Sequence, residues 1–533
     1  MKRFGVMLDM SRNAVMKPEQ VKKFATVLRS LGYNMLQLYT EDTYEVENEP
    51  YFGYMRGRYT TQELSDIVAY CNTIGVEVIP CIQTLAHLNQ IFRWGDYGNI
   101  NDFGDILLAE APRTYELIEN MFKTLRKSFT SEYVHIGMDE AHMLGLGKYL
   151  DKHGVKNRFE ILRDHLEKVI EIAEKYNFKP IMWSDMFFRL ANGGEYYPPD
   201  PMLTKEVKAV IPKSVGLVYW DYYHNEKEYY AKMLNAHLQA DNEVWFAGGA
   251  WTWTGFAGGN GKTLDTMVPA MSALRETDVE NIFMTMWGDN GKECSFYSVL
   301  PSLFAIRKVY DGETDMTKIK SEFEAITGES YDGLSELDLP NYVGGNKTCT
   351  GNVCKHMLYS DPFNGFLDTT VKDGVAAEYA AHAERLTELG KNSGFTYLFD
   401  SAAALCEVMS VKYDLGVRTR NAYKNNDKST LLNLADDYAK TVELLEKFYE
   451  KFQTLWFIEN KPHGFDVQDI RFGGLMQRLK ACRNRLIAYA TEKISSIPEL
   501  EEELLDFYGD GKEFRKDTPC YNGWIVNVSG NVI

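Results

Sequence analysis

Short apolar runs alternate with amphipathic helical stretches along the first 300 residues. Each run is apolar at most positions rather than at every second one, which is typical of strands covered on both faces. Eight such runs occur, at residues 3–9, 33–39, 76–82, 133–137, 179–184, 215–220, 244–250 and 282–287. The pattern therefore predicts eight buried strands.

Helix signals lie between these runs. Pro18 is typical of a first helical turn, and Gly32 is placed to end that helix. Thr60 and Glu63 have the spacing of a capping box before the next apolar helical face. Strands separated by helices form parallel sheets, and eight units in one series predict an α/β fold, a (β/α)8 TIM barrel. A doubly wound sheet is the alternative, but it seldom has eight units.

The pattern changes after about residue 310. Residues 330–370 are rich in Gly, Asp, Asn and Pro, which favours irregular structure. Long stretches with apolar residues at spacings of three and four follow, which predicts a mainly α-helical C-terminal domain. The predicted organisation is a barrel over residues 1–310, an irregular connection over 311–370 and a helical domain over 371–533.

Composition and charge reduce the number of function classes that fit this chain. The chain has 533 residues, and its formal net charge of −18 argues against a nucleic-acid or anionic-membrane partner. The N-terminus lacks the apolar core of a signal peptide and no apolar run reaches 18 residues, so we expect a soluble, cytoplasmic protein. The eight cysteines are scattered without a CxxC pair, and Cys349 and Cys354 are the only close ones. Ordinary reduced thiols are expected.

Carboxylates and aromatic side chains follow the predicted strands. In this barrel type the active site lies at the carboxyl ends of the strands, so these side chains are expected to converge on one rim. Together with acids, indole rings can form a box that stacks on a pyranose ring. The residues at the strand ends are Asp9 and Arg12, Glu41 and Asp42, His87, Asp139 and Glu140, Trp183, Tyr219 and Asp221, Trp251 and Trp253, and Trp287 and Asp289.

The adjacent Asp139 and Glu140 are the sharpest feature. Neighbours on a regular strand point to opposite faces, but a turn at the strand's end can direct both toward the axis. Two adjacent carboxylates repel each other, so at least one is expected to have a raised pKa and to serve as a general acid. The alternative is a solvated acidic pair at a helix N-terminus.

Metal and phosphate chemistry are less well supported. His87, His135, Asp139, Glu140 and His142 could form a metal site, but no HExxH motif is present and His135 is expected to pack inside the barrel. The glycine-rich segments lack both GxGxxG and GxxxxGK[ST]. No metal and no cofactor are expected.

The segment from His135 to Glu140 resembles the His-x-Gly-x-Asp-Glu signature of glycoside hydrolase family 20, the β-N-acetylhexosaminidases. The resemblance covers about residues 1–305, with support from Arg12, Trp183, the Tyr219-x-Asp221 pair and Trp287. Members usually carry a small α/β domain before the barrel. They also have Pro-Glu-x-Asp-x-Pro-Gly-His at strand 3, where this chain keeps only Pro80 and His87, and Trp-x-Glu at the last strand, where this chain has Asp289.

The resemblance implies an exo-acting enzyme that removes terminal N-acetylhexosamine by substrate-assisted catalysis. Glu140 would be the acid/base, and Asp139 would hold the acetamido group. Arg12 and Asp289 would bind sugar hydroxyls, and Tyr219 would donate to the acetamide oxygen. Either the Tyr219–Asp221 pair or the Trp251–Trp253 pair would form the acetamide wall. Trp183, Trp251, Trp253 and Trp287 would wall the pocket, and His87 would pair with Asp42 or Glu41 or act only as a cap.

Two other function classes remain open at this point. One is a two-carboxylate hydrolase with Glu140 as acid and Asp221 or Asp289 as nucleophile, which does not depend on an acetamido group. The other is a non-catalytic sugar-binding barrel. The expected partner is a glycan with a terminal N-acetylhexosamine.

Overall fold

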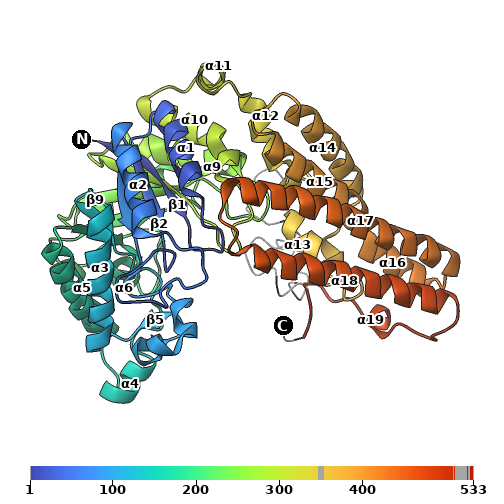
Figure 1. Ribbon diagram of the computed structural model, residues 1–533, viewed down its shortest axis with the longest axis horizontal. Helices are drawn as coiled ribbons and strands as arrows, with labels where there is room; N and C mark the ends of the chain where they lie inside the picture. Colours follow the sequence, from blue (N-terminus) through green and yellow to red (C-terminus); the bar gives the residue numbers. More distant parts are fainter. Residues whose placement is uncertain (1, 346–352, 508, 510–524, 526–527, 532–533) are drawn as a thin grey trace. The chain divides into compact units, whose positions relative to one another are not determined.

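The computed structural model describes residues 2–345, 353–507, 509, 525 and 528–531 (Figure 1). The chain divides into two compact units. The first comprises Met1–Ala250, Thr263–Trp287 and Ser302–Thr327, and the second comprises Trp251–Lys262, Gly288–Pro301 and Gly328–Ile533.

The first unit is built on a closed barrel of eight parallel strands, which confirms the predicted fold. Around the barrel the order is β1, β10, β9, β8, β7, β6, β3 and β2, so neighbours in the barrel are also successive barrel strands along the chain. Each of the eight predicted runs overlaps one of these strands. They are β1 (Arg3–Asp9), β2 (Met35–Tyr39), β3 (Glu77–Cys81), β6 (Tyr133–His135), β7 (Lys179–Trp183), β8 (Gly216–Trp220), β9 (Val244–Gly249) and β10 (Asn281–Met286).

These strands are buried at nearly every position because helices cover their outer side and side chains fill the interior. Trp183 and Trp245 are among the largest fully buried side chains, and each lies near Phe283 of β10. A separate hairpin, β4 (Asn101–Phe103) and β5 (Ile106–Leu107), lies in the connection after β3.

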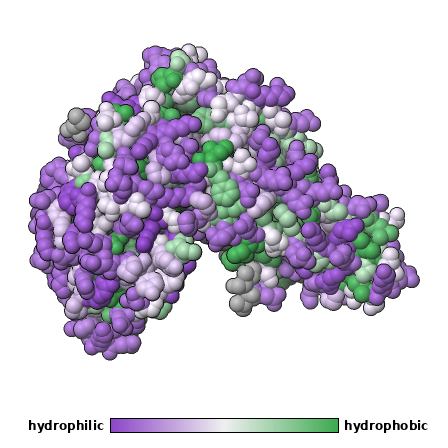
Figure 2. Space-filling view, viewed as in Figure 1, coloured by the Kyte–Doolittle hydropathy of each residue, from purple (hydrophilic) through white to green (hydrophobic). Residues whose placement is uncertain are grey.

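Helices follow the strands around the barrel (Figure 1). The expected capping box is present, since Thr60 accepts from the Glu63 amide and the Glu63 side chain accepts from the Thr60 amide. On the face shown in Figure 2 the surface over α2 and α3 is mainly hydrophilic, as expected for amphipathic helices on a barrel. These helices are α1 (Pro18–Ser30), α2 (Thr61–Thr73), α3 (Pro112–Ser128), α4 (Lys148–His153), α5 (Arg158–Lys175), α6 (Asp185–Ala191), α7 (Lys205–Val210), α8 (Lys227–Leu238), α9 (Asn260–Leu274), α10 (Leu300–Asp311) and α11 (Met316–Thr327).

The second unit is mainly helical, as the apolar spacing predicts. In its longest helix, α17 (Lys428–Glu459), the apolar residues Leu431, Leu434 and Tyr438 recur at spacings of three and four and are buried. This helix packs against α15 (Thr396–Lys412) and α18 (Phe465–Ala490). The helices are α12 (Tyr331–Ser335), α13 (Val353–Tyr359), α14 (Val375–Gly390), α15 (Thr396–Lys412), α16 (Leu415–Lys424), α17 (Lys428–Glu459), α18 (Phe465–Ala490) and α19 (Pro498–Glu501). The expected irregular connection over 311–370 is not irregular throughout, because it contains α11, α12 and α13.

None of the helices in the described ranges is long and apolar enough to cross a membrane. The six cysteines within those ranges are buried free thiols. Cys349, one of the two closely spaced cysteines, lies outside the described residues, as does Cys520.

Candidate active site

A strained turn after β6 brings two carboxyl groups to the mouth of the barrel. Gly137, Met138 and Glu140 all have positive φ angles, of 71°, 69° and 51°. A Cβ at Gly137 would lie 2.0 Å from Oε1 of Gln83, so this turn requires glycine. The side chain of Asp139 is 13% exposed and that of Glu140 is 46% exposed, which leaves Glu140 the more accessible of the two.

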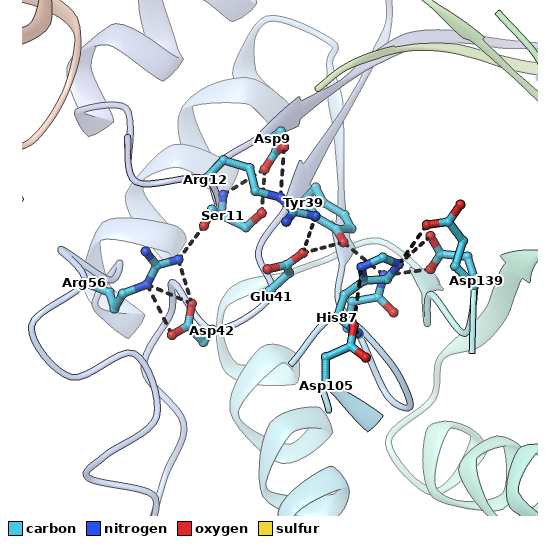
Figure 3. Close-up of polar contacts among 12 residues, drawn as sticks. Asp9, Ser11, Arg12, Tyr39, Glu41, Asp42, Arg56, His87, Asp105 and Asp139 are labelled. Atoms are coloured by element: carbon cyan, nitrogen blue, oxygen red, sulfur yellow. Dashed lines mark hydrogen bonds and ion pairs between the residues drawn. The ribbon is translucent and has the colours of Figure 1, made fainter. Parts of the chain in front are cut away.

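Asp139 is held as a carboxylate by two neighbours from the connection after β3. Gln83 donates from Nε2 to Asp139 Oδ1 over 2.8 Å, and Nε2 of His87 lies 3.2 Å from Asp139 Oδ2 (Figure 3). Burial favours the neutral acid, but the charge of His87 and the hydrogen bond from Gln83 outweigh burial and keep the pKa of Asp139 below its ordinary value. The adjacent pair was expected to contain at least one carboxyl with a raised pKa while its neighbour stays anionic, and Asp139 is not the one whose pKa is raised.

His87 is correspondingly stabilised as a cation. Burial of the ring lowers its pKa, but the Asp139 carboxylate outweighs burial and raises the pKa of His87 to about 10. Its Nε2 also lies 3.8 Å from Glu140 Oε2, and its Nδ1 lies 4.0 Å from Asp105. The expected pairing of His87 with Asp42 or Glu41 is therefore replaced by an ion pair with Asp139. Asp42 instead pairs with Arg56, over 3.2 Å.

A third carboxyl group, that of Asp185, supports this turn through a hydrogen bond to its backbone. Asp185 begins α6 and accepts a hydrogen bond of 3.2 Å from the backbone amide of Glu140. Its side chain is fully buried, with Nε of Arg189 3.6 Å away. Burial and the charge of Asp139 raise the pKa of Asp185 to about 7.

Arg12 is anchored beside the carboxylates by two acidic residues. Its terminal nitrogen lies 2.9 Å from Oε1 of Glu41, and its Nε lies 3.8 Å from Asp9. The hydroxyl of Tyr39 also donates to Glu41, over 3.0 Å (Figure 3). The same hydroxyl accepts from Nε2 of Gln83. Burial raises the pKa of Glu41 to about 7, although the cationic neighbours Arg12 and His87 lower it. A continuous polar network thus joins Arg12 to Asp139.

Two tryptophans lie close together at the carboxyl ends of the strands. The ring centroids of Trp183 and Trp287 are 6.0 Å apart, and Trp287 meets Tyr39 edge to face at 4.9 Å. His135 packs 4.3 Å from Trp183 inside the barrel, and burial lowers the pKa of His135 to about 3, so this histidine is neutral. Among the described residues, no group of three or more His, Cys, Asp or Glu side chains is arranged to hold a metal ion.

Tyr219 and Asp221 are hydrogen-bonded to each other. The Tyr219 hydroxyl donates to Asp221 Oδ2 over 2.8 Å, and its ring stacks on His237 of α8. Asp221 also lies 2.8 Å from Nδ1 of His224 and accepts from the amide of Tyr223. Because the ring faces the helix layer, this arrangement does not support Tyr219 as a donor to a substrate acetamide.

Three of the predicted site residues belong to the second unit. Trp251 and Trp253 stack on each other there, with centroids 4.1 Å apart and an interplanar angle of 27°. Asp289 lies just after β10 with a φ of +33°. All three immediately follow barrel strands in the sequence, as expected for rim residues.

Replacing Asp185 by asparagine is expected to change how stability depends on pH. The asparagine can still accept from the Glu140 amide, but it cannot ionise. With a folded pKa of about 7 and an unfolded pKa of about 4, Asp185 favours the folded state most below about pH 4, and that contribution is lost progressively as pH rises from about 4 to about 7. Relative to wild type, Asp185→Asn is expected to gain about 2.5 kcal/mol between pH 5 and pH 8.

Thermal melting of both proteins at pH 5 and pH 8 measures this difference. Asp151→Asn, at an exposed position of α4, is the matched control and is expected to track the wild type at both pH values. A constant difference in melting temperature between Asp185→Asn and wild type would show that Asp185 does not titrate in this range.

Two family models match the chain. The model described as the glycosyl hydrolase family 20 catalytic domain matches residues 3–246, and the one described as the Glycoside Hydrolase 20C C-terminal domain matches residues 329–518. Between them they cover most of the barrel and most of the helical unit.

Individual proteins and solved structures resemble this chain only at low sequence identity. A probable beta-hexosaminidase of Arthroderma benhamiae is 24% identical over 252 residues, which are 41% of this chain and 38% of that protein. Hexosaminidase D of Homo sapiens is 24% identical over 227 residues, which are 41% of this chain and 44% of that protein. This chain thus spans less than half the length of either relative. A GH20 exo beta-N-acetylglucosaminidase from Vibrio harveyi, solved in complex with N-acetylglucosamine, superposes with a TM-score of 0.48 at 16% identity, covering 63% of this chain and 58% of that one.

Proposed function

Since this chain belongs to glycoside hydrolase family 20, we propose that it is an exo-acting, retaining β-N-acetylhexosaminidase that releases terminal β-linked N-acetylglucosamine, and N-acetylgalactosamine where its hydroxyl contacts allow. The observation that carries the proposal is the unequal environment of the two adjacent carboxyl groups. Asp139 is kept anionic by His87 and Gln83, while Glu140 is nearly half exposed beside it.

The close pairing of these carboxyl groups favours substrate assistance. A retaining enzyme with its own nucleophile needs two carboxyl groups about 5–5.5 Å apart on opposite sides of the bond, whereas substrate-assisted enzymes such as those of family 20 do not. Adjacent residues on one turn cannot easily flank both faces of a sugar ring. In the proposed mechanism the substrate's own acetamido oxygen therefore attacks C1 and forms an oxazolinium ion.

Each side chain then has a defined task. Glu140 protonates the leaving oxygen and later removes a proton from the incoming water. Asp139 accepts the acetamide N–H and offsets the positive charge that develops on the oxazolinium. His87 fixes Asp139 in its anionic form. No cofactor or metal is needed for these steps.

The remaining residues bind and enclose the sugar. Arg12, fixed by Glu41 and Asp9, presents a planar donor group to two sugar hydroxyls. Trp183 and Trp287 provide apolar surface for the ring or the acetyl methyl group. The sequence positions of Trp251 and Trp253 after β9 and of Asp289 after β10 are those at which the family resemblance implies further walls and a hydroxyl contact.

The two-carboxylate alternative receives less support from the geometry. Asp221, one of its candidate nucleophiles, is fully buried and bonded to Tyr219, His224 and a backbone amide. A nucleophile must have a free oxygen facing C1, and Asp221 does not offer one. The intact, ionised Asp139 beside Glu140 also argues against a barrel that only binds sugar.

A panel of aryl β-glycosides tests the proposal. The wild-type protein is expected to hydrolyse 4-nitrophenyl β-glycosides of N-acetylglucosamine and N-acetylgalactosamine, and to be at least about a hundredfold slower on the matching sugars without the acetamido group, because those lack the nucleophile. Comparable rates on glucose and N-acetylglucosamine derivatives would contradict substrate assistance.

With chitooligosaccharides, the first product is expected to be the monosaccharide, and early release of longer internal fragments would contradict exo action.

A further inference from the structure

Three aromatic side chains form a cluster in two connections that, like the turn carrying Glu140, follow barrel strands. Tyr51 and Tyr54 lie in the connection between β2 and α2 and are 40% and 46% exposed. Trp94 lies in the connection between β3 and α3. Its ring stacks on Tyr51 at 5.6 Å and meets Tyr54 edge to face at 5.4 Å. We call these three residues the aromatic platform.

The backbone beneath the tyrosines is firmly anchored. Phe52 is fully buried and packs edge to face on Tyr44, at 5.3 Å. Gly53 has a φ of +65°, and a Cβ there would lie 2.0 Å from the carbonyl oxygen of Asp42. Arg58 donates to the carbonyls of Pro50 and Phe52. The tyrosines are therefore presented outward by a rigid turn.

Hydrogen bonds also link the connection that carries Trp94 to the turn that carries Tyr51 and Tyr54. Tyr97, three residues after Trp94, donates to the buried Glu49 over 3.0 Å. Glu49 also receives both terminal nitrogens of Arg113 and the side-chain amide of Asn120. Because Glu49 precedes Tyr51 by two residues, this network fixes both connections in one arrangement. Preorganised aromatic surface of this kind lowers the entropic cost of binding a ligand.

The platform is continuous with the catalytic network. Arg56, two residues after Tyr54, pairs with Asp42 and donates to the carbonyl of Ser11. Figure 3 shows Arg56 and Asp42 at one end of the row of polar residues that leads through Arg12 and Glu41 to His87. His87, which holds Asp139, is in the same connection as Trp94.

From these observations, and resting on the proposed function, we infer that the aromatic platform binds a pyranose unit of the substrate beyond the bond that is cleaved. Flat aromatic faces stack on the C–H faces of sugars, and tyrosine hydroxyls supply hydrogen bonds at the same time. The exposed neighbours Arg93 and Asp96 add polar groups that suit sugar hydroxyls better than an apolar protein surface. The preferred substrate is accordingly an oligosaccharide, not a simple glycoside.

Binding of chitotriose to the Glu140→Gln protein, which is expected not to cleave it, tests this inference directly. Calorimetric titration is expected to show about three- to tenfold weaker binding of chitotriose after Trp94→Ala or Tyr54→Ala, the range expected for one aromatic contact. Binding of N-acetylglucosamine, which cannot reach beyond the first sugar, is expected to stay unchanged. Tyr70→Ala, a partly exposed tyrosine on α2, is the matched control.

Kinetics provide the second readout. In the otherwise wild-type protein, both platform variants are expected to raise KM for chitotriose by a similar factor and to leave inhibition by free N-acetylglucosamine, which occupies only the terminal-sugar site, unchanged. Unaltered chitotriose binding, or equal weakening of the monosaccharide, would overturn the platform. A wild-type protein without any activity on acetamido glycosides would instead overturn the proposed function, and the titrations would still decide on the platform.

Discussion

Glu140→Gln is expected to lower turnover of chitooligosaccharides by about 10²- to 10⁴-fold, the range that one general acid contributes. A sugar alkoxide is a poor leaving group and needs a proton as the bond breaks. Glutamine keeps the size of the side chain and the backbone hydrogen bond from Glu140 to Asp185, but it has no proton to give. The loss therefore reports on proton transfer and not on the fold of the turn.

The same variant is expected to be much less impaired on glycosides with an activated leaving group, such as 2,4-dinitrophenol, since these depart without protonation. Steady-state rates on the two kinds of substrate measure the difference. Glu110→Gln, at the barrel's rim but bonded to Tyr149, is the control and is expected to retain full activity on both. Equal impairment of Glu140→Gln on both substrates would count against Glu140 as the acid.

The barrel could be predicted because its strands have a distinctive composition. Runs such as residues 244–250 are apolar throughout, and only strands covered on both sides tolerate that pattern. The predicted bounds were less accurate at the start of a run. Tyr33, for example, precedes β2, and its ring packs on Phe4 while its hydroxyl reaches the carbonyl of Leu303. Apolarity records burial, and a buried residue need not belong to a strand.

The acidic pair of the site could also be predicted, because its signal lies within a few neighbouring residues. Asp139 and Glu140 are adjacent in sequence, and the glycine before them signals the turn that directs both to the barrel's mouth. Tyr219 shows where this approach fails. Alternate residues of a strand face opposite sides, and the sequence does not reveal which set faces the axis, so the direction of Tyr219 could not be read from its position near the end of a run.

The supporting residues could not be predicted because their roles exist only in three dimensions. Gln83 comes from β3's connection, Asp185 from the start of α6 and Tyr39 from β2, and each contacts the turn or its network from a distant part of the sequence. A single glutamine or aspartate after a strand carries no signal of its own. Only the departure at Gln83 from the family's strand-3 pattern marked that position as unusual.

Asp139→Asn is expected to slow hydrolysis of acetamido substrates by about 10²- to 10³-fold, the typical cost of losing one preorganised electrostatic contact. Asparagine still fills the space between Gln83 and His87, but it cannot offset the charge of an oxazolinium ion. It also removes the carboxylate that holds His87 as a cation, so the pKa of His87 is expected to fall from about 10. An NMR titration of the His87 ring in the variant checks that consequence without any substrate.

The same substitution separates the two hydrolytic mechanisms. If the acetamide is the nucleophile, Asp139 never bonds to C1, so azide is not expected to restore the rate of Asp139→Asn. A thiazoline that mimics the oxazolinium is expected to inhibit the wild type and to bind the variant more weakly, because the carboxylate that complements its charge is gone. A two-carboxylate enzyme would behave in the opposite way, with azide rescue of its nucleophile variant and no response to the thiazoline. Mass spectrometry of the wild type during turnover is decisive, since a sugar esterified to any aspartate or glutamate would rule out the substrate-assisted mechanism.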